Sequence, residues 1–159
     1  MKAAVVTVSD GVSAGEREDE SGALLVELLA AEEFDVEHRV VPDERPKIAA
    51  ALRELAQEAR VILTTGGTGV SPRDFTPEAT ASVLDRAVPG IAEALRADAI
   101  AKTPHGLLGR GVAGVRGHTL IVNLPGSPGG CRDGFALLQP ALRHAVELIG
   151  GEQTEHVQT

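Results

Sequence analysis

The 159-residue chain has 43% hydrophobic residues, enough for one packed core, and its formal net charge is −8. The negative charge and the lack of a basic run disfavour nucleic acid and anionic membranes as partners, because both depend on clustered positive charge. Aromatic residues make up only 2% of the chain, which also disfavours the stacking of bases on aromatic side chains.

We expect one domain over residues 1–150 and a polar tail over residues 151–159. No apolar stretch approaches the roughly 20 residues of a membrane span, and the single cysteine, Cys131, fits a reducing compartment. We therefore expect a cytoplasmic protein.

Four runs rich in Val, Ile and Leu predict β-strands, at residues 3–9, 36–41, 61–65 and 119–124. Their weak alternation is typical of strands covered on both faces. Apolar spacing predicts helices over 21–33, 44–59 and about 90–101, and a further helix that begins with Thr76 as its N-cap. A last helical region, at about 132–149, contains Pro140, so we expect a kink or two helices. The glycine-rich residues 106–117 are expected to form an irregular crossing or a short hairpin.

The alternation of strands and helices predicts an α/β fold with a largely parallel sheet between helices. A polar or glycine-rich loop follows each predicted strand: these loops begin at Ser9, Pro42, Thr65 and Pro125. Ligands bind beyond the carboxyl ends of parallel strands. We therefore expect the four loops to share one edge of the sheet.

The loop over residues 65–69, Thr-Gly-Gly-Thr-Gly, follows an apolar strand directly and predicts a phosphate site. Glycine reaches positive φ and lets main-chain N–H groups approach an anion. The loop is neither a Walker A sequence nor a Rossmann fingerprint. Arg73 and Asp74 follow it, which strengthens the functional interpretation over that of a plain tight turn.

Asp43 and Asp74 leave neighbouring predicted strands, and as a pair they would suit Mg²⁺ bound to a triphosphate. Asp43 also stands where a helix N-cap would be, and that structural role is at least as well supported by the sequence alone. For Asp19, capping of the first helix is favoured over ligand contact. Cys131 lies in a first helical turn, where a thiol pKa can fall, but a structural thiol is the preferred interpretation. The five histidines show no metal-ligand spacing.

The stretch 65–80 closely resembles the signature of the molybdopterin adenylyltransferase family, of the MogA/MoaB type. Three more segments match in order: residues 8–22, 41–44 and 123–128. The resemblance spans about residues 4–150 and departs from many relatives at Gly109-Arg110, where they have Ser-Arg.

The resemblance implies a three-layer α/β/α fold, a homo-oligomer (trimer or hexamer) and a step in molybdenum cofactor biosynthesis. In that step the terminal phosphate of molybdopterin attacks Mg·ATP and releases pyrophosphate, and a downstream molybdenum-insertion protein takes the product. Asp43 and Asp74 match the family's essential aspartates, here assigned as catalytic and Mg²⁺-binding. The nucleotide and phosphate assignment covers Ser9, Asp10, Gly66, Gly67, Thr68 and Gly69, and the pterin assignment covers Ser13, Arg73, Asn123, Pro125, Gly126 and Ser127.

Two alternatives stay open. The chain could be a non-catalytic oligomeric protein of the MoaB type that binds molybdopterin without adenylylating it. It could also be a pyrophosphatase that acts on nucleotides without any pterin.

Overall fold

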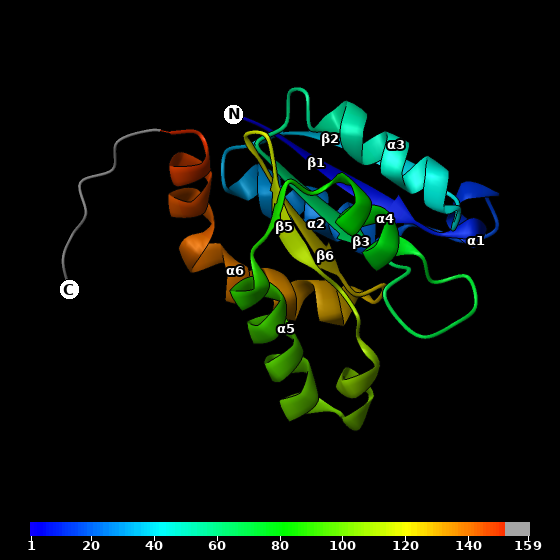
Figure 1. Cartoon of the computed structure of the whole chain (residues 1–159). Helices are drawn as coiled ribbons and strands as arrows, with labels where there is room; N and C mark the ends of the chain where they lie inside the picture. The colour runs from blue at the N-terminus through cyan, green and yellow to red at the C-terminus, as the bar shows by residue number, and fades with distance from the viewer. Residues whose placement is uncertain (152–159) are drawn as a thin grey trace.

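The computed structural model describes residues 1–151, called the described residues below. Their strands form one sheet in the order β2-β1-β3-β6-β5-β4. The strand bounds are β1 Lys2–Val8, β2 Asp35–Val41, β3 Val61–Thr65, β4 Arg86–Ala87, β5 Ala113–Arg116 and β6 Thr119–Leu124. Strands β1, β2, β3 and β6 pair in parallel (Figure 1). At one edge of the sheet β5 pairs antiparallel with β6, and β4 pairs antiparallel with β5. The predicted α/β class with a largely parallel sheet is confirmed.

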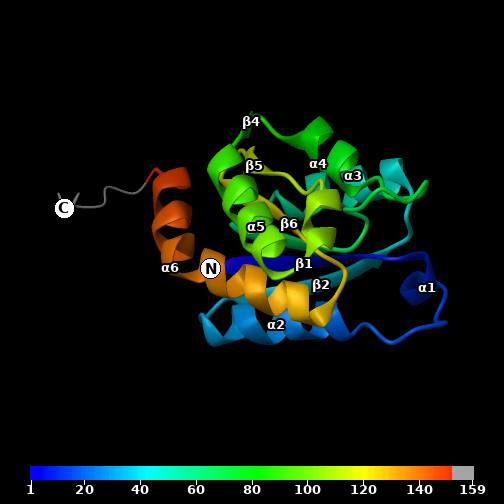
Figure 2. The same ribbon diagram turned by 90° about the horizontal axis from the view of Figure 1, so that it is seen from below.

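The helices are α1 Asp10–Ser13, α2 Glu20–Ala31, α3 Arg45–Leu55, α4 Thr76–Val83, α5 Pro89–Lys102, the 3₁₀ segment η1 Pro104–Leu108, and α6 Pro128–Ile149. Figure 2 shows α2 and α6 on one side of the sheet and α3 and α4 on the other, so the three-layer prediction is also confirmed. None of these helices is both long and apolar enough to cross a membrane.

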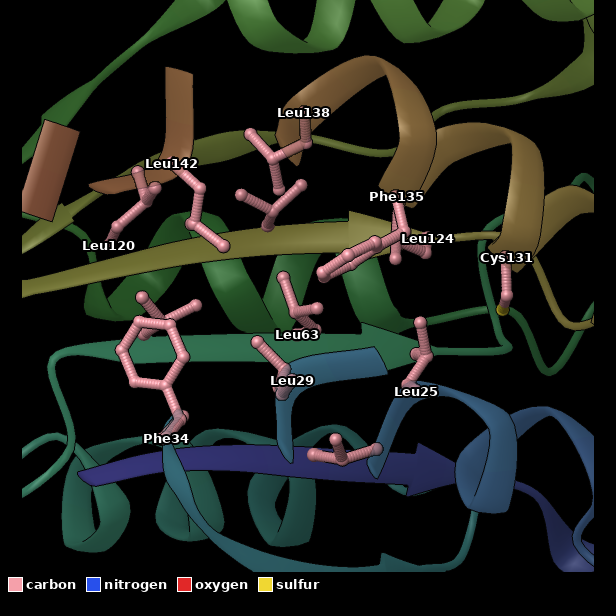
Figure 3. Close-up of a cluster of buried hydrophobic side chains, with 14 of the residues drawn as sticks. Leu25, Leu29, Phe34, Leu63, Leu120, Leu124, Cys131, Phe135, Leu138 and Leu142 are labelled. Carbon is pink, nitrogen blue, oxygen red and sulfur yellow. The ribbon is translucent and has the colours of Figure 1, made fainter. Parts of the chain in front are cut away.

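Two aliphatic cores hold the layers together, one on each face of the sheet. In α6, Phe135, Leu138, Leu142 and Val146 recur at helical spacing and are buried, which turns that face of the helix toward the sheet. Figure 3 shows Phe135, Leu138 and Leu142 of α6 on the same side of the sheet as Leu63 of β3. The opposite core combines the apolar faces of α3 and α4 with alternate residues of β1 and with Ile62 of β3 and Ile121 of β6.

Several local predictions were wrong or incomplete. β2 is not covered on both faces: it forms an edge of the sheet, and only Val41 of its seven residues is buried. The short hairpin expected over residues 106–117 is confirmed in part: the region contains the end of η1 and then β5, which forms a hairpin with β6. The short strand β4 gave no pattern long enough to detect. Of the two outcomes expected at Pro140, the kink is confirmed: α6 is one continuous helix, and Figure 1 shows that it changes direction along its length.

The helix caps divide between correct and incorrect predictions. Asp19 does cap α2, where its Oδ1 accepts a hydrogen bond from the N–H of Gly22 (2.9 Å). Thr76 does not cap α4: the N-cap is Phe75, and the Thr76 hydroxyl donates to the carbonyl of Gly66 instead (2.9 Å). The hydroxyl is drawn away from its own helix because the buried turn beside it needs a donor. The predicted tail, apart from Gly151, lies outside the described residues.

Candidate active site

The four predicted loops do share one edge of the sheet. They follow β1, β2, β3 and β6, whose parallel register brings their carboxyl ends together. The antiparallel strands β4 and β5 carry none of these loops. This edge is the candidate site.

Gly66 and Gly67 make the turn that leaves β3, with φ angles of 97° and 68°. A Cβ on Gly66 would overlap the carbonyl oxygen of Val8 at the end of β1. The Gly66 N–H donates to the carbonyl of Leu124 at the end of β6 (3.3 Å). The turn is therefore held where three strands end, and only glycine fits there.

The loop that follows presents main-chain donors without partners. The N–H groups of Gly67, Thr68 and Gly69 donate to no acceptor among the described residues. Successive free N–H groups at a positive-φ turn form a concavity that attracts anions. The arrangement therefore has the donors that a bound phosphate requires.

Asp10 and Asp43 join the loops after β1 and β2 by two reciprocal hydrogen bonds. The N–H of Asp10 donates to Asp43 Oδ2, and the N–H of Asp43 donates to Asp10 Oδ1, both at 2.9 Å. Asp43 is therefore not a helix cap; the N-cap of α3 is Glu44, whose side chain makes no capping bond. The second oxygen of Asp43, Oδ1, faces the glycine turn, 3.3 Å from where a Cβ on Gly67 would stand.

The loop between β3 and α4, residues 66–75, is called the glycine loop below. Arg73 of this loop reaches Asp10 and forms a two-pronged ion pair with it. Its Nε donates to Asp10 Oδ2 (2.7 Å) and its second terminal nitrogen donates to Asp10 Oδ1 (3.1 Å). Both carboxylate oxygens of Asp10 are thus occupied, and the Arg73 hydrogen bonds hold the pKa of that carboxyl below its ordinary value. Asp10 acts here as a bridge between two loops rather than as a free ligand.

Negative charge is concentrated at Asp43. Burial raises the pKa of its carboxyl, the nearby Asp10 and Asp74 carboxylates raise it further, and the Asp10 N–H opposes them. Asp74 lies in the glycine loop. Its Oδ2 accepts a hydrogen bond from the N–H of Ser71 (3.0 Å) and stands 2.9 Å from where a Cβ on Gly69 would be. The glycines at 67 and 69 keep both carboxylates uncovered.

This arrangement fits a Mg²⁺ ion that is shared with a substrate. Among residues 1–151, no group of three or more His, Cys, Asp and Glu side chains could hold a metal by itself. Mg²⁺ usually takes one or two carboxylates and completes its shell with phosphate oxygens and water. The uncovered Asp43 and Asp74, whose mutual repulsion a cation would relieve, match that requirement.

The segment after β6 is mostly committed to the fold. The buried amide of Asn123 donates to the hydroxyls of Thr64 and Thr80 and accepts from the N–H of Val112, so its side chain has no group left for a ligand. Ser127 caps α6 by accepting from the N–H of Gly130 (3.1 Å). The polar groups of both side chains are therefore used within the fold, and contact with a ligand would come mainly from the main chain around Asn123 and Ser127.

Cys131 is also structural. Its thiol is fully buried, where it donates to the hydroxyl of Thr65 and the carbonyl of Pro125. Burial raises the pKa of the Cys131 thiol. The position of Cys131 at the start of a helix could have lowered this pKa, but the effect of burial is larger. The preferred interpretation of Cys131 as a structural thiol therefore holds.

Two hollows adjoin the glycine loop. A cleft of about 450 Å³ lies between this loop, α5 and the start of α6, and it includes Thr68, Gly69, Asn123, Pro125 and Ser127. A second hollow, of about 390 Å³, opens on the other side against the N-terminus of α2. Its lining includes Ser9, Ser21, Gly66 and Gly126. Two separate ligands could therefore meet at residues 66–69.

Other predicted residues lie beside these hollows rather than in their walls. Asp43 and Asp74 flank the loop, and Arg73 is held against Asp10. Ser13 is exposed at the end of α1 and lines neither hollow. The sequence therefore predicted the loops that meet better than the direction of each side chain.

Sequence reasoning missed the role of Arg110 and the contribution of α5. Arg110 donates to the carbonyls of Gly69 and Asp74 and to the carboxylate of Glu78, all within or just after the glycine loop. α5 supplies one wall of the larger cleft. For Arg110, the available signal was a single arginine within a glycine-rich segment. The helix α5 was predicted, but nothing in its sequence indicated that it would form a wall of the cleft.

Residues 4–144 match a protein family described as a probable molybdopterin binding domain. The chain belongs to this family. The match covers the whole candidate site, from the loop after β1 to the start of α6.

Solved and curated members of the molybdopterin-binding family are closely similar. The crystal structure of the molybdopterin biosynthesis enzyme MoaB from Thermus thermophilus is 48% identical, with a TM-score of 0.88 over 97% of this chain and 99% of that one. The molybdopterin adenylyltransferase of Helicobacter pylori strain J99 is 37% identical over 92% of this chain and 86% of its own length. The Drosophila melanogaster molybdenum cofactor synthesis protein cinnamon is 41% identical over 93% of this chain, which spans only 25% of that longer protein.

Gly66→Ala tests the close approach of the glycine turn to β1. We expect the free energy of unfolding to fall by at least about 3 kcal/mol, because positive φ and overlap with the Val8 carbonyl act together. Gly15→Ala is the matched control: its φ is 74°, but nothing lies within 4 Å of its added Cβ, so a loss of only about 1 kcal/mol is expected. Urea denaturation measures both. Equal losses would show that the approach to Val8 does not matter.

Asp43→Asn tests the concentration of charge. A carboxyl whose pKa is higher in the folded state binds its proton more tightly there, so folding loses stability as pH rises above the ordinary value of 3.8 through the raised pKa. Asparagine can still accept the bond from Asp10, and we expect its stability relative to wild type to increase from pH 3.5 to pH 7 in urea titrations. Glu16→Gln, which removes one exposed charge elsewhere, should show no such trend. A stability relative to wild type that does not increase between pH 3.5 and pH 7 would contradict the charge argument.

Proposed function

We propose that this protein is a molybdopterin adenylyltransferase of molybdenum cofactor biosynthesis. It would transfer the AMP group of ATP to the terminal phosphate of molybdopterin and release pyrophosphate. The glycine loop carries this proposal: its three free N–H groups lie between two hollows and beside two uncovered carboxylates. The relatives from Helicobacter pylori and Haemophilus influenzae that are named molybdopterin adenylyltransferase support the same reaction.

The reaction places few chemical demands on the protein. A bond forms between a terminal phosphate oxygen of molybdopterin and the α-phosphorus of ATP, and the bond from that phosphorus to the bridging β-phosphate oxygen breaks. The attacking phosphate is already an anion, so no general base is needed. Positioning and neutralisation of charge therefore dominate catalysis.

Each hollow suits one substrate. The N-terminus of α6 borders the smaller hollow and favours an anion. Arg17 in the same wall adds a positive charge beside the carboxylates of residues 18–20, so we assign the nucleotide to that side with Ser9 and Gly66. The larger cleft, with Pro125 and Ser127 in its wall, has the volume of a small-molecule site and is assigned to the pterin. The reacting phosphates would then meet over Gly67, Thr68 and Gly69.

Asp43 and Asp74 would hold Mg²⁺, which when bound offsets the charge of the triphosphate. Arg73 would bind a substrate phosphate after its ion pair with Asp10 breaks. The ion pair is accessible, with side chains 59% and 45% exposed, so breaking it costs little. Asp10 itself is not assigned to the phosphates, contrary to the expectation from the sequence, because its oxygens are occupied and a carboxylate repels them.

The first experiment measures pyrophosphate release from Mg·ATP, with and without molybdopterin under anaerobic conditions, with detection of the product by mass. Strictly pterin-dependent release with an adenylylated product is expected. Binding of molybdopterin without release would favour the non-catalytic alternative. Release without the pterin would favour a nucleotide pyrophosphatase.

Asp74→Asn should abolish this turnover and leave the fold intact, because the amide keeps the size of the side chain and removes the charge. We expect the loss in kcat to be at least about 100-fold, with an unchanged circular dichroism spectrum and an unchanged affinity for molybdopterin. Asp85→Asn, at an exposed turn outside the site, is the control. Turnover of Asp74→Asn at the wild-type rate would remove Asp74 from the mechanism.

We also propose that the protein is a homo-oligomer, with a trimer expected and a hexamer possible by resemblance. α5 contains no buried residue in the single chain, and the 3₁₀ turn after it exposes Leu107 (67%) and Leu108 (50%). Figure 1 shows α5 projecting from the body of the fold. A surface of this kind is typical of an interface between subunits.

Light scattering after gel filtration tests this assembly. The wild type should have the mass of a trimer, and Leu107→Gln combined with Leu108→Gln should shift it toward the monomer by removing apolar contacts. Leu148→Gln, at a similarly exposed leucine on α6, should not. A monomeric wild type would refute the assembly.

The remaining assignments follow from the proposed pathway. The product would pass to a downstream molybdenum-insertion protein, and the reaction would take place in the cytoplasm. Residues 1–150 would act as a single domain.

A further inference from the structure

Arg110 lies between η1 and β5, and all of its hydrogen bonds go to one segment, residues 68–78. Its main-chain N–H donates to the carbonyl of Thr68 (2.8 Å). In its side chain, Nε donates to the carbonyl of Gly69 (2.7 Å), and a terminal nitrogen donates to the carbonyl of Asp74 (2.9 Å). The other terminal nitrogen pairs with Glu78 Oε1 (2.6 Å). One residue thus holds both ends of the loop that carries the free N–H groups.

These bonds determine which way the loop's peptide groups face. In a trans peptide the carbonyl and the next N–H point in opposite directions. Because Arg110 draws in the carbonyls of Thr68 and Gly69, the N–H groups of Gly69 and Val70 are turned away from it. The bond to the Asp74 carbonyl fixes the backbone from which the Asp74 carboxylate projects.

Thr76 closes the base of the loop through bonds to the carbonyls of Gly66 and Gly67, but the residues between have no other strong attachment. Val70 is 63% exposed at its outer part, and Figure 1 shows the segment between β3 and α4 extending away from the fold. Arg73 ties the loop to Asp10, but by an exposed ion pair that a phosphate can displace. Between residues 68 and 74, Arg110 is the attachment to another part of the fold that does not use a group required by the substrates.

We propose that Arg110 is a positioning residue for adenylyl transfer: it holds the glycine loop so that the phosphate-binding N–H groups and Asp74 keep their places while Arg73 exchanges Asp10 for substrate. The inference rests on the proposed function. Glu78 secures the guanidinium, and Arg110 in turn holds the pKa of the Glu78 carboxyl below its ordinary value. Lysine cannot replace Arg110, because its single ammonium cannot reach three separate acceptors in a planar fork.

The hydrogen bonds from Arg110 to residues 68–78 are called the clamp below. Hydrogen exchange tests this clamp without any substrate or metal. In Arg110→Lys and Arg110→Ala, the amides of Ser71, Asp74 and Thr76, which hydrogen-bond within the loop, should exchange at least about tenfold faster than in wild type. Arg116→Lys and Arg116→Ala are the matched controls. Arg116 donates to the carbonyl of Val83 at the other end of α4 and should leave the loop amides unchanged. Equal exchange in wild type and the Arg110 variants would overturn the clamp, whatever the activities are.

Kinetics then test whether the clamp positions the catalytic groups. We expect Arg110→Lys to lower kcat by about 10- to 100-fold, with the KM for molybdopterin changed less than about threefold. Faster exchange with unchanged kcat would overturn the positioning role. If the wild type shows no pterin-dependent turnover, the proposed function fails and with it the catalytic role, while the exchange result still decides whether Arg110 clamps the loop. Arg110→Lys keeps these tests available should Arg110→Ala fail to fold.

Discussion

The passage of Gly66 over the carbonyl of Val8 is the contact on which the site depends. At this point the chain leaves β3, crosses the end of β1 and hydrogen-bonds to the end of β6. The Gly66 carbonyl accepts from Thr76, which places the start of α4. A Cβ on Gly126, in the loop after β6, would stand 3.4 Å from the Gly66 Cα, so that loop packs on the same turn. Three strands and one helix are therefore aligned by a residue that has no side chain.

Charge is arranged around this turn at some cost to folding. Asp10, Asp43 and Asp74 come from three loops, and their repulsion is relieved only partly by Arg73. An acidic chain would not gather carboxylates here for stability alone. Such an arrangement is typical of sites where a cation and an anionic substrate complete the balance of charge.

The fold and the placement of the site could be predicted because both follow from periodic patterns. Apolar runs located the parallel strands, and parallel strands bring their loops to one edge whatever side chains those loops carry. Individual side-chain directions could not be predicted, since they depend on partners distant in sequence. The Thr76 hydroxyl bonds to Gly66 instead of capping its own helix, and the Asp43 carboxylate bonds to the main chain of Asp10. The side-chain amide of Asn123 bonds to buried hydroxyls within the fold. The edge position of β2 was likewise set by the order of the strands, which its own residues do not encode.

The burial of Cys131 has a consequence for the chemistry of sulfur at this site. Its thiol lies in the core behind the loop after β6, bonded to Thr65 and Pro125, with a raised pKa. Thiol–disulfide exchange requires an accessible thiolate, and this sulfur is neither accessible nor readily ionised. The proposed pterin substrate carries a dithiolene, whose two sulfurs are themselves prone to oxidation. The protein can therefore hold such a ligand close to its only cysteine without forming a mixed disulfide with it.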